Sequence, residues 1–253
     1  MLNIIIPMAG AGSRFAKAGY ADPKPLIPVN GTPMIKVVID NLTPQCEHRF
    51  IFICQASHVA SYGLREKLSA WAPGCEIVEL NGLTEGAACT VYTAKDLIDN
   101  DHPVMIANSD QYVDMDINAY LQAMVEAGAD GLIMTMEADD PKWSFVGFNE
   151  DGLINQVVEK EVISNEATVG IYNFRTGKQL IESIDAMIAK DLRVNGEFYV
   201  APAYNEIIAQ GAKVIHFNVG SEANGMYGLG IPADLDLFLS LPVSQKATSG
   251  LVA

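Results

Sequence analysis

The residues of this chain best suited to chemistry lie in one loop near the N-terminus. The apolar run Leu2–Ile6 is followed by AGAGSR at residues 9–14 and by PKPL at residues 23–26. Glycines directly after a buried strand let backbone N–H groups approach a phosphate or a base closely. Arg14 adds a fork of donors for phosphate oxygens, and Lys24 adds a compact positive charge. The loop therefore predicts a nucleotide-binding site, whose backbone residues are Ala9, Gly10, Gly12 and Ser13.

Neither of two common phosphate-binding loops fits this segment. A Walker A loop ends in Gly-Lys followed by Ser or Thr, and no such ending follows these glycines. The dinucleotide-binding GxGxxG pattern needs a third glycine where the chain has Phe15. The glycines by themselves also suit a tight turn from a strand into a loop. The arginine, the later PKPL and the position after the first strand favour a binding function.

A carboxylate is expected close to this loop. Asp110 ends the segment Asn108-Ser109-Asp110, directly after the apolar run 104–107. Ligands of parallel sheets bind beyond the carboxyl ends of the strands, so Asp110 and the glycine-rich loop are expected at one edge. Carboxylate oxygens are ligands that Mg²⁺ prefers. The four histidines and four cysteines show no zinc spacing, and no Ser-His-Asp or Cys-His arrangement stands out.

These motifs together resemble a known family. The run IIPMAGAGSRF followed by PKPL resembles the signature of sugar-phosphate nucleotidyltransferases, which have the glycosyltransferase A-type α/β fold. Further similarities follow in family order, namely NSD at 108–110, EK at 159–160, SNEATVGIYNF at 164–174 and GIPAD at 230–234. The pattern is most similar to glucose-1-phosphate thymidylyltransferases and phosphocholine cytidylyltransferases. The resemblance spans residues 4 to about 240.

The resemblance implies a defined reaction. An oxygen of a phosphorylated acceptor attacks the α-phosphorus of a nucleoside triphosphate, and pyrophosphate leaves. By this resemblance Arg14 would hold the β- and γ-phosphates, Lys24 would neutralise the α-phosphate, and Asp110 would bind Mg²⁺. A phosphate monoester is already anionic near neutral pH, so no general base is needed. The expected catalytic residues are therefore Arg14, Lys24 and Asp110, with Asp110 as the metal ligand.

The resemblance also places contacts to the base and ribose. Thr84, Glu85 and Gly86 precede an expected helix and match the family's position for these contacts. Gly86 would let the base lie against the backbone. The structural alternative is a capping segment, with Thr84 as the N-cap and Glu85 in the first turn. Both interpretations stay open, and a pyrimidine nucleotide is preferred because the best match is to thymidylyl and cytidylyl enzymes.

A third set of residues is expected to bind the acceptor. Lys160 would hold its phosphate, while Glu159 and Gly147 would shape the pocket around its organic part. The alternative is a surface ion pair on a hairpin strand, which contributes little to stability. Trp143 could stack on a ligand, and Tyr199 and Glu197 could contact the acceptor. We nevertheless assign Trp143 to packing, and Tyr199 and Glu197 to the region that caps the following helix.

The chain departs from the family at its second metal ligand. Aligning Gly230 and Pro232 with the family's C-terminal GTPED puts Gly228 where an aspartate is usual. Three interpretations remain. Glu222, Asp114 or another acid replaces it, Asp110 holds the metal with phosphates and waters, or catalysis has been lost.

Two other functions remain open. A nucleotide-sugar glycosyltransferase of the same fold would need a DxD metal motif. Asp114-Met115-Asp116 has that spacing, although it stands at an expected helix start, where a cap is typical. A non-catalytic nucleotide sensor is suggested only by Gly228. The acceptor itself, a sugar phosphate or a similar small phosphorylated metabolite, is not identified by these motifs.

Alternating strands and helices must position these residues. We expect an α/β fold with a single Rossmann-like, mostly parallel mixed sheet flanked by helices, and an antiparallel hairpin in the acceptor-binding region. Strands are expected at 2–6, 50–54, 76–80, 104–107, 131–137, 143–148, 157–160, 168–174 and 213–217. Helices are expected at 33–41, 57–71, 85–98, 119–127, 179–190, 200–210 and 233–239. Residues 1–240 form one domain, with an NTP-binding half at 1–140 and an acceptor-binding half at 141–240, and 241–253 form a tail with a disordered composition.

Composition limits the partners. The 253 residues carry a net charge of −15, which argues against nucleic acid and anionic membranes as partners. Residues 1–36 instead hold four basic residues and one acid, which suits a small anionic ligand. No signal segment or spanning run is recognised, and the cysteine usage fits a reducing cytosol, so a cytoplasmic protein is expected. A homo-oligomer is compatible with the sequence, which does not fix the oligomeric state.

Overall fold

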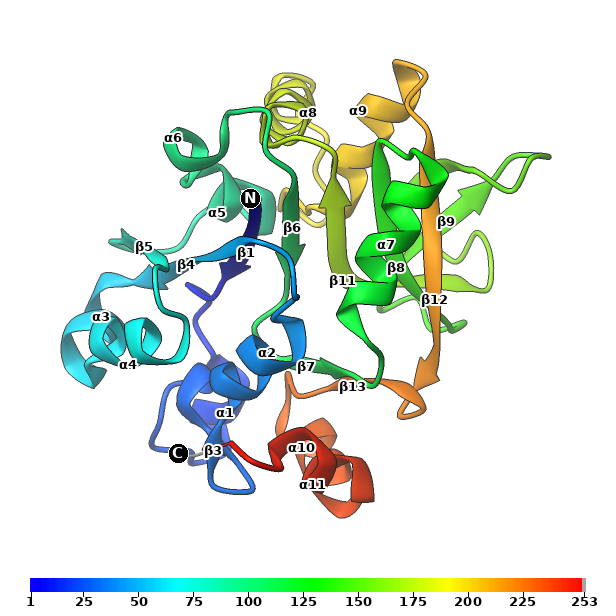
Figure 1. The fold of residues 1–253 in the computed structure, drawn as a ribbon. Helices are drawn as coiled ribbons and strands as arrows, with labels where there is room; N and C mark the ends of the chain where they lie inside the picture. Colours follow the sequence, from blue (N-terminus) through cyan, green and yellow to red (C-terminus); the bar gives the residue numbers. More distant parts are fainter. Residues whose placement is uncertain (252–253) are drawn as a thin grey trace.

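A computed structural model describes residues 1–251 and shows one large mixed sheet with helices on both faces (Figure 1). The strands lie in the order β5-β4-β1-β6-β11-β8-β12-β13-β7, and β9 and β10 form a hairpin that pairs with β11. Their bounds are β1 Leu2–Pro7, β4 His48–Gln55, β5 Glu76–Leu80, β6 Val104–Ala107, β7 Gln111–Val113, β8 Gly131–Glu137, β9 Ser144–Phe148, β10 Ile154–Glu159, β11 Glu166–Phe174, β12 Val214–Glu222 and β13 Gly225–Gly228. A separate small ribbon joins β2 Pro28–Val29 to β3 Thr32–Pro33.

The direction of the strands confirms the expected fold class. Strands β5, β4, β1 and β6 are all parallel, whereas β11 is antiparallel to both β6 and β8. Strand β12 then runs parallel to β8. The carboxyl ends of β1 and β6 therefore meet at one edge, which is where the glycine-rich loop and Asp110 leave the sheet.

Strand β1 shows why the sheet needs helices on both faces. Ile4 and Ile6 belong to one apolar core and Ile5 to another, so successive side chains are buried on opposite sides. A strand that is apolar at every position is typical of a parallel sheet covered on both faces. The helices are α1 Ser13–Lys17, α2 Met34–Leu42, α3 Ala56–Tyr62, α4 Leu64–Trp71, α5 Ala87–Tyr92, α6 Lys95–Ile98, α7 Ile117–Ala127, α8 Gly177–Ala189, α9 Tyr204–Ala209, α10 Pro232–Ser240 and α11 Pro242–Thr248.

Three expected helices are interrupted. The helix expected at 57–71 is two helices, because Gly63 adopts a left-handed conformation between α3 and α4 (φ +60°). The first of these, α3, also begins one residue earlier than expected, at Ala56, so Ser57 lies inside it. The helix expected at 85–98 begins only after Gly86 and is divided into α5 and α6. The one expected at 200–210 begins as a 3₁₀ turn, Ala201–Ala203, before α9.

The segment expected as a disordered tail instead contains α11. A third apolar cluster contains Phe15 from α1, Phe238 from α10 and Ala247 from α11, so both C-terminal helices pack near the glycine-rich loop (Figure 1). Lys246 also forms an ion pair with Asp114. Residues 252 and 253 of the expected tail lie outside the described residues.

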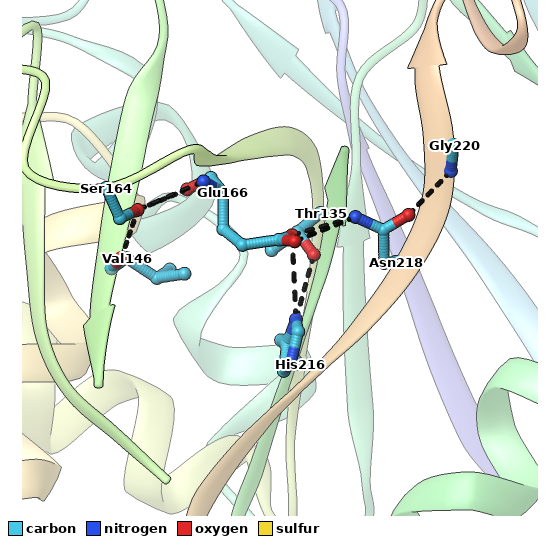
Figure 2. Close-up of polar contacts among 7 residues, drawn as sticks. All are labelled: Thr135, Val146, Ser164, Glu166, His216, Asn218 and Gly220. Carbon is cyan, nitrogen blue, oxygen red and sulfur yellow. Dashed lines mark hydrogen bonds and ion pairs between the residues drawn. The ribbon is translucent and has the colours of Figure 1, made fainter. Parts of the chain in front are cut away.

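The hairpin is confirmed, and a polar network ties it to the sheet. Its turn holds Gly152 at φ +76°, next to Asp151. Figure 2 shows the network around Glu166, at the start of β11. The Glu166 carboxylate accepts hydrogen bonds from the side chain of Asn218 on β12 at 3.0 and 2.9 Å. Ser164 donates to the carbonyl of Val146 on β9 at 2.7 Å, so the SNE segment joins the hairpin to the sheet.

None of the helices in residues 1–251 is both long enough and apolar enough to span a bilayer.

Candidate active site

The loops at the predicted sheet edge enclose a cavity of about 530 Å³. Side chains reach it from the loops after β1, β6 and β8, from the β12–β13 turn and from the start of α10. Its lining includes both expected charged residues, Arg14 and Asp110. The other lining residues are Asn108, Gln111, Lys142, Trp143, Glu222, Met226, Gly228, Gly230, Ile231 and Asp234.

Lys24 and Asp110 meet in this edge, although 86 positions separate them in the sequence. The Lys24 ammonium donates to the Asp110 carboxylate, and both side chains are about one-quarter exposed, at 24% and 23%. A Cβ at Gly230 would lie 2.6 Å from Asp110 Oδ2, so the absence of a side chain there leaves room for the pair. The structure thus brings the three expected catalytic residues, Arg14, Lys24 and Asp110, to one place.

The glycine-rich loop forms a smaller cavity of about 220 Å³ beside the first, with Ser13, Arg14 and Lys24 in its lining. Gly12 is left-handed (φ +59°), and a Cβ there would lie 3.5 Å from Lys24 Cβ. Gly10 is exposed, with nothing within 4 Å of its Cβ position. Ala9 is buried and lines neither cavity.

Gln55 fixes the position of this loop, which the sequence did not indicate. Its side-chain amide donates to the carbonyl of Ala9 at 2.5 Å and to that of Gly82 at 2.9 Å. The loop after β1 is thereby bound to the loop after β5.

A third cavity, of about 250 Å³, adjoins the first and contains Glu159. Glu159 is only 9% exposed and accepts a hydrogen bond from the Ser144 hydroxyl. Burial raises the pKa of Glu159, while Ser144 and the neighbouring Lys160 lower it. Lys160 is left-handed (φ +59°), and its ammonium donates to the Tyr199 hydroxyl at 2.6 Å. Tyr199 lines this cavity, so Lys160 lies at its margin.

A family model described as Nucleotidyl transferase matches residues 3–195. The chain belongs to the nucleotidyl transferase family. The resemblance noted from the sequence motifs is thereby confirmed.

Related proteins agree with the fold. The chain is similar to a nucleoside-diphosphate-sugar pyrophosphorylase from Vibrio cholerae, with a TM-score of 0.80 and 26% identity, over 94% of this chain and 100% of that one. It is 26% identical to the bifunctional protein GlmU of Exiguobacterium sibiricum over 230 residues, 81% of this chain and 46% of that protein. It is 58% identical to a 2-aminoethylphosphonate cytidylyltransferase of Lancefieldella rimae, over only 40 residues, or 16% of each chain. In the longer matches the chain spans about half the length of the curated relatives.

Gly86 of this nucleotidyl transferase lies against Phe198, which is far from it in the sequence. Its φ is +131°, and a Cβ would lie 2.6 Å from the backbone nitrogen of Phe198 and closer still to its carbonyl oxygen. Phe198 N–H donates to the Glu85 carbonyl at 2.8 Å, and Ala88 N–H donates to the Phe198 carbonyl at 3.0 Å. The need for glycine is explained by this close approach.

Thr84 and Glu85, the neighbours of Gly86, also form contacts with other residues of the protein. The Thr84 hydroxyl donates to the Gly86 carbonyl at 3.0 Å, and Gly86 itself is the N-cap of α5, so the expectation of Thr84 as N-cap is wrong. The Glu85 carboxylate pairs with Arg193 at 2.6 Å. Of the three residues assigned to nucleotide contacts, Glu85 and Gly86 therefore connect that loop to residues 193–198, whereas Thr84 bonds within its own segment.

Gly147 does not line the acceptor-side cavity. A Cβ there would lie 3.2 Å from Asn155 Oδ1 and 3.3 Å from Ile163 Cδ1. Ser144, three residues earlier on β9, lines that cavity instead. Side chains alternate along a strand, so positions separated by an odd number face opposite sides.

Sequence reasoning underestimated Trp143. It packs against the main apolar core, as we expected, but it also lines both the first and the third cavity. Its indole nitrogen is buried and has no hydrogen-bond partner among residues 1–251. The ammonium of Lys142 lies 4.8 Å from its ring centroid.

Proposed function

We propose that this nucleotidyl transferase moves a nucleoside monophosphate from a triphosphate to a small phosphorylated acceptor and releases pyrophosphate. One observation carries the proposal. The cavity with Arg14 and Asp110 and the cavity with Glu159 share the lining residues Asn108, Lys142 and Trp143. Two ligands bound in these cavities would therefore be in contact, with one cation, Lys142, at their junction.

The charges suit a reaction between two polyanions. Arg14 lines both the main cavity and the small cavity of the glycine-rich loop, where it is placed to hold the β- and γ-phosphates. Lys24 lies between that loop and Asp110, where it would neutralise charge on the α-phosphate as pyrophosphate leaves. Reactions of this kind depend mainly on positioning and on electrostatic stabilisation.

The cavity also fits a divalent cation, which we propose to be Mg²⁺. Among the described residues no three His, Cys, Asp or Glu side chains form a ready metal cluster. Mg²⁺ is often held by one or two carboxylates together with substrate phosphates and waters. Asp110 alone would therefore supply enough protein ligands for the ion. When bound, the ion would neutralise phosphate charge.

The acceptor would bind beside Glu159. Its buried carboxylate can accept hydrogen bonds from hydroxyl or ammonium groups, and Lys160 at the margin would attract the acceptor phosphate. A sugar phosphate or a similar phosphorylated metabolite satisfies both. We propose a pyrimidine triphosphate as the donor, which agrees with the short match to a cytidylyltransferase. The four free cysteines are consistent with a reducing cytoplasm.

The DxD spacing at 114–116, which a glycosyltransferase function would need as a metal motif, makes other contacts in this structure. Asp116 caps α7 by accepting from the N–H of Asn118, and Asp114 pairs with Lys246. Neither residue lines the main cavity.

Pyrophosphate release should be measured with each common nucleoside triphosphate against a panel of hexose 1-phosphates, phosphocholine and 2-aminoethylphosphonate, with Mg²⁺. The proposal expects release that requires both a triphosphate and an acceptor. Triphosphate binding without release in any pair would favour a sensor. Nucleotide release from nucleotide sugars would favour a glycosyltransferase. Either result would contradict the proposal.

A further inference from the structure

The position of Gly228 defines where a second carboxylate is missing. Gly228 lies on β13 opposite Gln111 on β7, and the next N–H, of Leu229, donates to the Asp110 carbonyl at 2.8 Å. Gly228 and Asp110 both line the main cavity. Glycine leaves position 228 without a side chain.

Another carboxylate lies directly beside that position. The point where a Cβ of residue 228 would stand lies 3.4 Å from Asp234 Oδ2. Asp234 comes from the first turn of α10, which begins at Pro232, and it lines the same cavity as Asp110. The missing side chain and the carboxylate that lies beside its position thus come from different elements.

Asp234 differs from the other acids that were candidates for this role. Glu222 is held by Lys142 at 3.0 and 3.1 Å, and Asp114 is paired with Lys246 away from the cavity. Among residues 1–251, the Asp234 carboxylate has no hydrogen-bond or ion-pair partner. Of the three acids Glu222, Asp114 and Asp234, it is the one that is left unpaired within the described part of the chain.

The local electrostatics agree with this arrangement. Burial raises the pKa of Asp234, and the charges of Glu222 and Asp110 raise it further, while Lys142 and Arg14 lower it. Asp234 and Asp110 are thus close enough to repel each other. Two carboxylates with hard oxygen donors at the edge of a phosphate site suit Mg²⁺ or Mn²⁺.

We propose that Asp234, from α10, supplies the second metal-binding carboxylate of this site and replaces the side chain that Gly228 lacks. This inference rests on the proposed function for its nucleotide substrate. In this arrangement the second metal-binding carboxylate comes from the start of helix α10 and not from strand β13. A carboxylate introduced at position 228 should therefore substitute for the one at position 234.

The test is Mn²⁺ binding, followed by electron paramagnetic resonance, in the presence of a non-hydrolysable triphosphate analogue. Asp234→Ala and the isosteric Asp234→Asn should weaken Mn²⁺ binding by about tenfold or more. The double variant Asp234→Ala with Gly228→Asp should recover most of the affinity. Asp114→Asn, in which an acid outside the cavity is changed, is the matched control and should bind Mn²⁺ like the unmodified protein.

Unchanged Mn²⁺ binding in both Asp234 variants would overturn the inference. A loss in Glu222→Gln as large as in Asp234→Asn would also overturn it, because Glu222 would then share the role. Mn²⁺ binding can be measured whether or not the protein turns over its substrates. A protein that binds Mn²⁺ through Asp234 but releases no pyrophosphate would refute the proposed function alone, whereas pyrophosphate release without dependence on Asp234 would refute this inference alone.

Discussion

The contact between Gly86 and Phe198 predicts a specific cost for one added methyl group. In Gly86→Ala the new Cβ would stand 2.6 Å from the backbone nitrogen of Phe198. Gly82→Ala is a matched control, because Gly82 has a similar φ of +122° but nothing within 4 Å of its Cβ position. The control carries the backbone strain without the steric clash.

The expected magnitudes differ. A non-glycine residue in such a conformation costs about 1–3 kcal/mol, and both variants should lose this amount. In Gly86→Ala the backbone of Phe198 must also move, and two hydrogen bonds connect it to residues 85 and 88. At about 0.5–1.5 kcal/mol each, their loss adds about 1–3 kcal/mol. For a chain of this size that further loss lowers the Tm by about 2–12 °C.

The assay is thermal unfolding of both variants, together with steady-state kinetics. Phe198 precedes Tyr199, which lines the acceptor-side cavity, so Gly86→Ala should also raise the KM for the acceptor more than the KM for the triphosphate. Equal losses of Tm in the two variants would refute the argument that close approach, rather than backbone conformation, requires glycine at 86.

Three further predictions concern the charged residues. Lys24→Ala should lower kcat by about 10²-fold, because its charge would stabilise the transition state, and unchanged turnover would remove Lys24 from the mechanism. Asp110→Ala should abolish Mg²⁺-dependent turnover and leave the circular dichroism spectrum intact, whereas unfolding would assign Asp110 a structural role. Burial raises the pKa of Glu159, so its charge destabilises the fold above that pKa. Glu159→Gln should therefore raise the Tm at neutral pH, with the gain vanishing as the pH falls through the raised pKa towards the ordinary value of 4.5, and should raise the acceptor KM. A Tm below that of the unmodified protein at neutral pH would contradict this reasoning.

The sequence predicted the first strand, the loop after it and the position of Asp110 well, because their signals are local. An apolar strand that ends in glycines has one common interpretation, and β1, its loop and Asp110 lie where that interpretation places them. Parallel strands have their carboxyl ends at one edge, so the meeting of Lys24 and Asp110 followed from topology.

Other features depend on contacts that a linear pattern does not contain. The motif alignment located the vacant position at 228, but not that the Asp234 side chain would reach it from α10. The family resemblance placed Gly147 in the acceptor pocket. Gly147 lies three residues after Ser144 on β9, however, and therefore on the opposite face of that strand. In α11 the buried residues Ser244 and Ala247 are small, so the helix resembled a polar tail.

The most direct test of the account is the fate of the α-phosphate. A triphosphate labelled with ³²P at the α-position should be incubated with the acceptor identified in the pyrophosphate screen, and the products should be separated. The account predicts that the label appears in a nucleotide–acceptor conjugate, with unlabelled pyrophosphate in equal amount. Label that remains in triphosphate, or appears only in free monophosphate, would contradict nucleotidyl transfer.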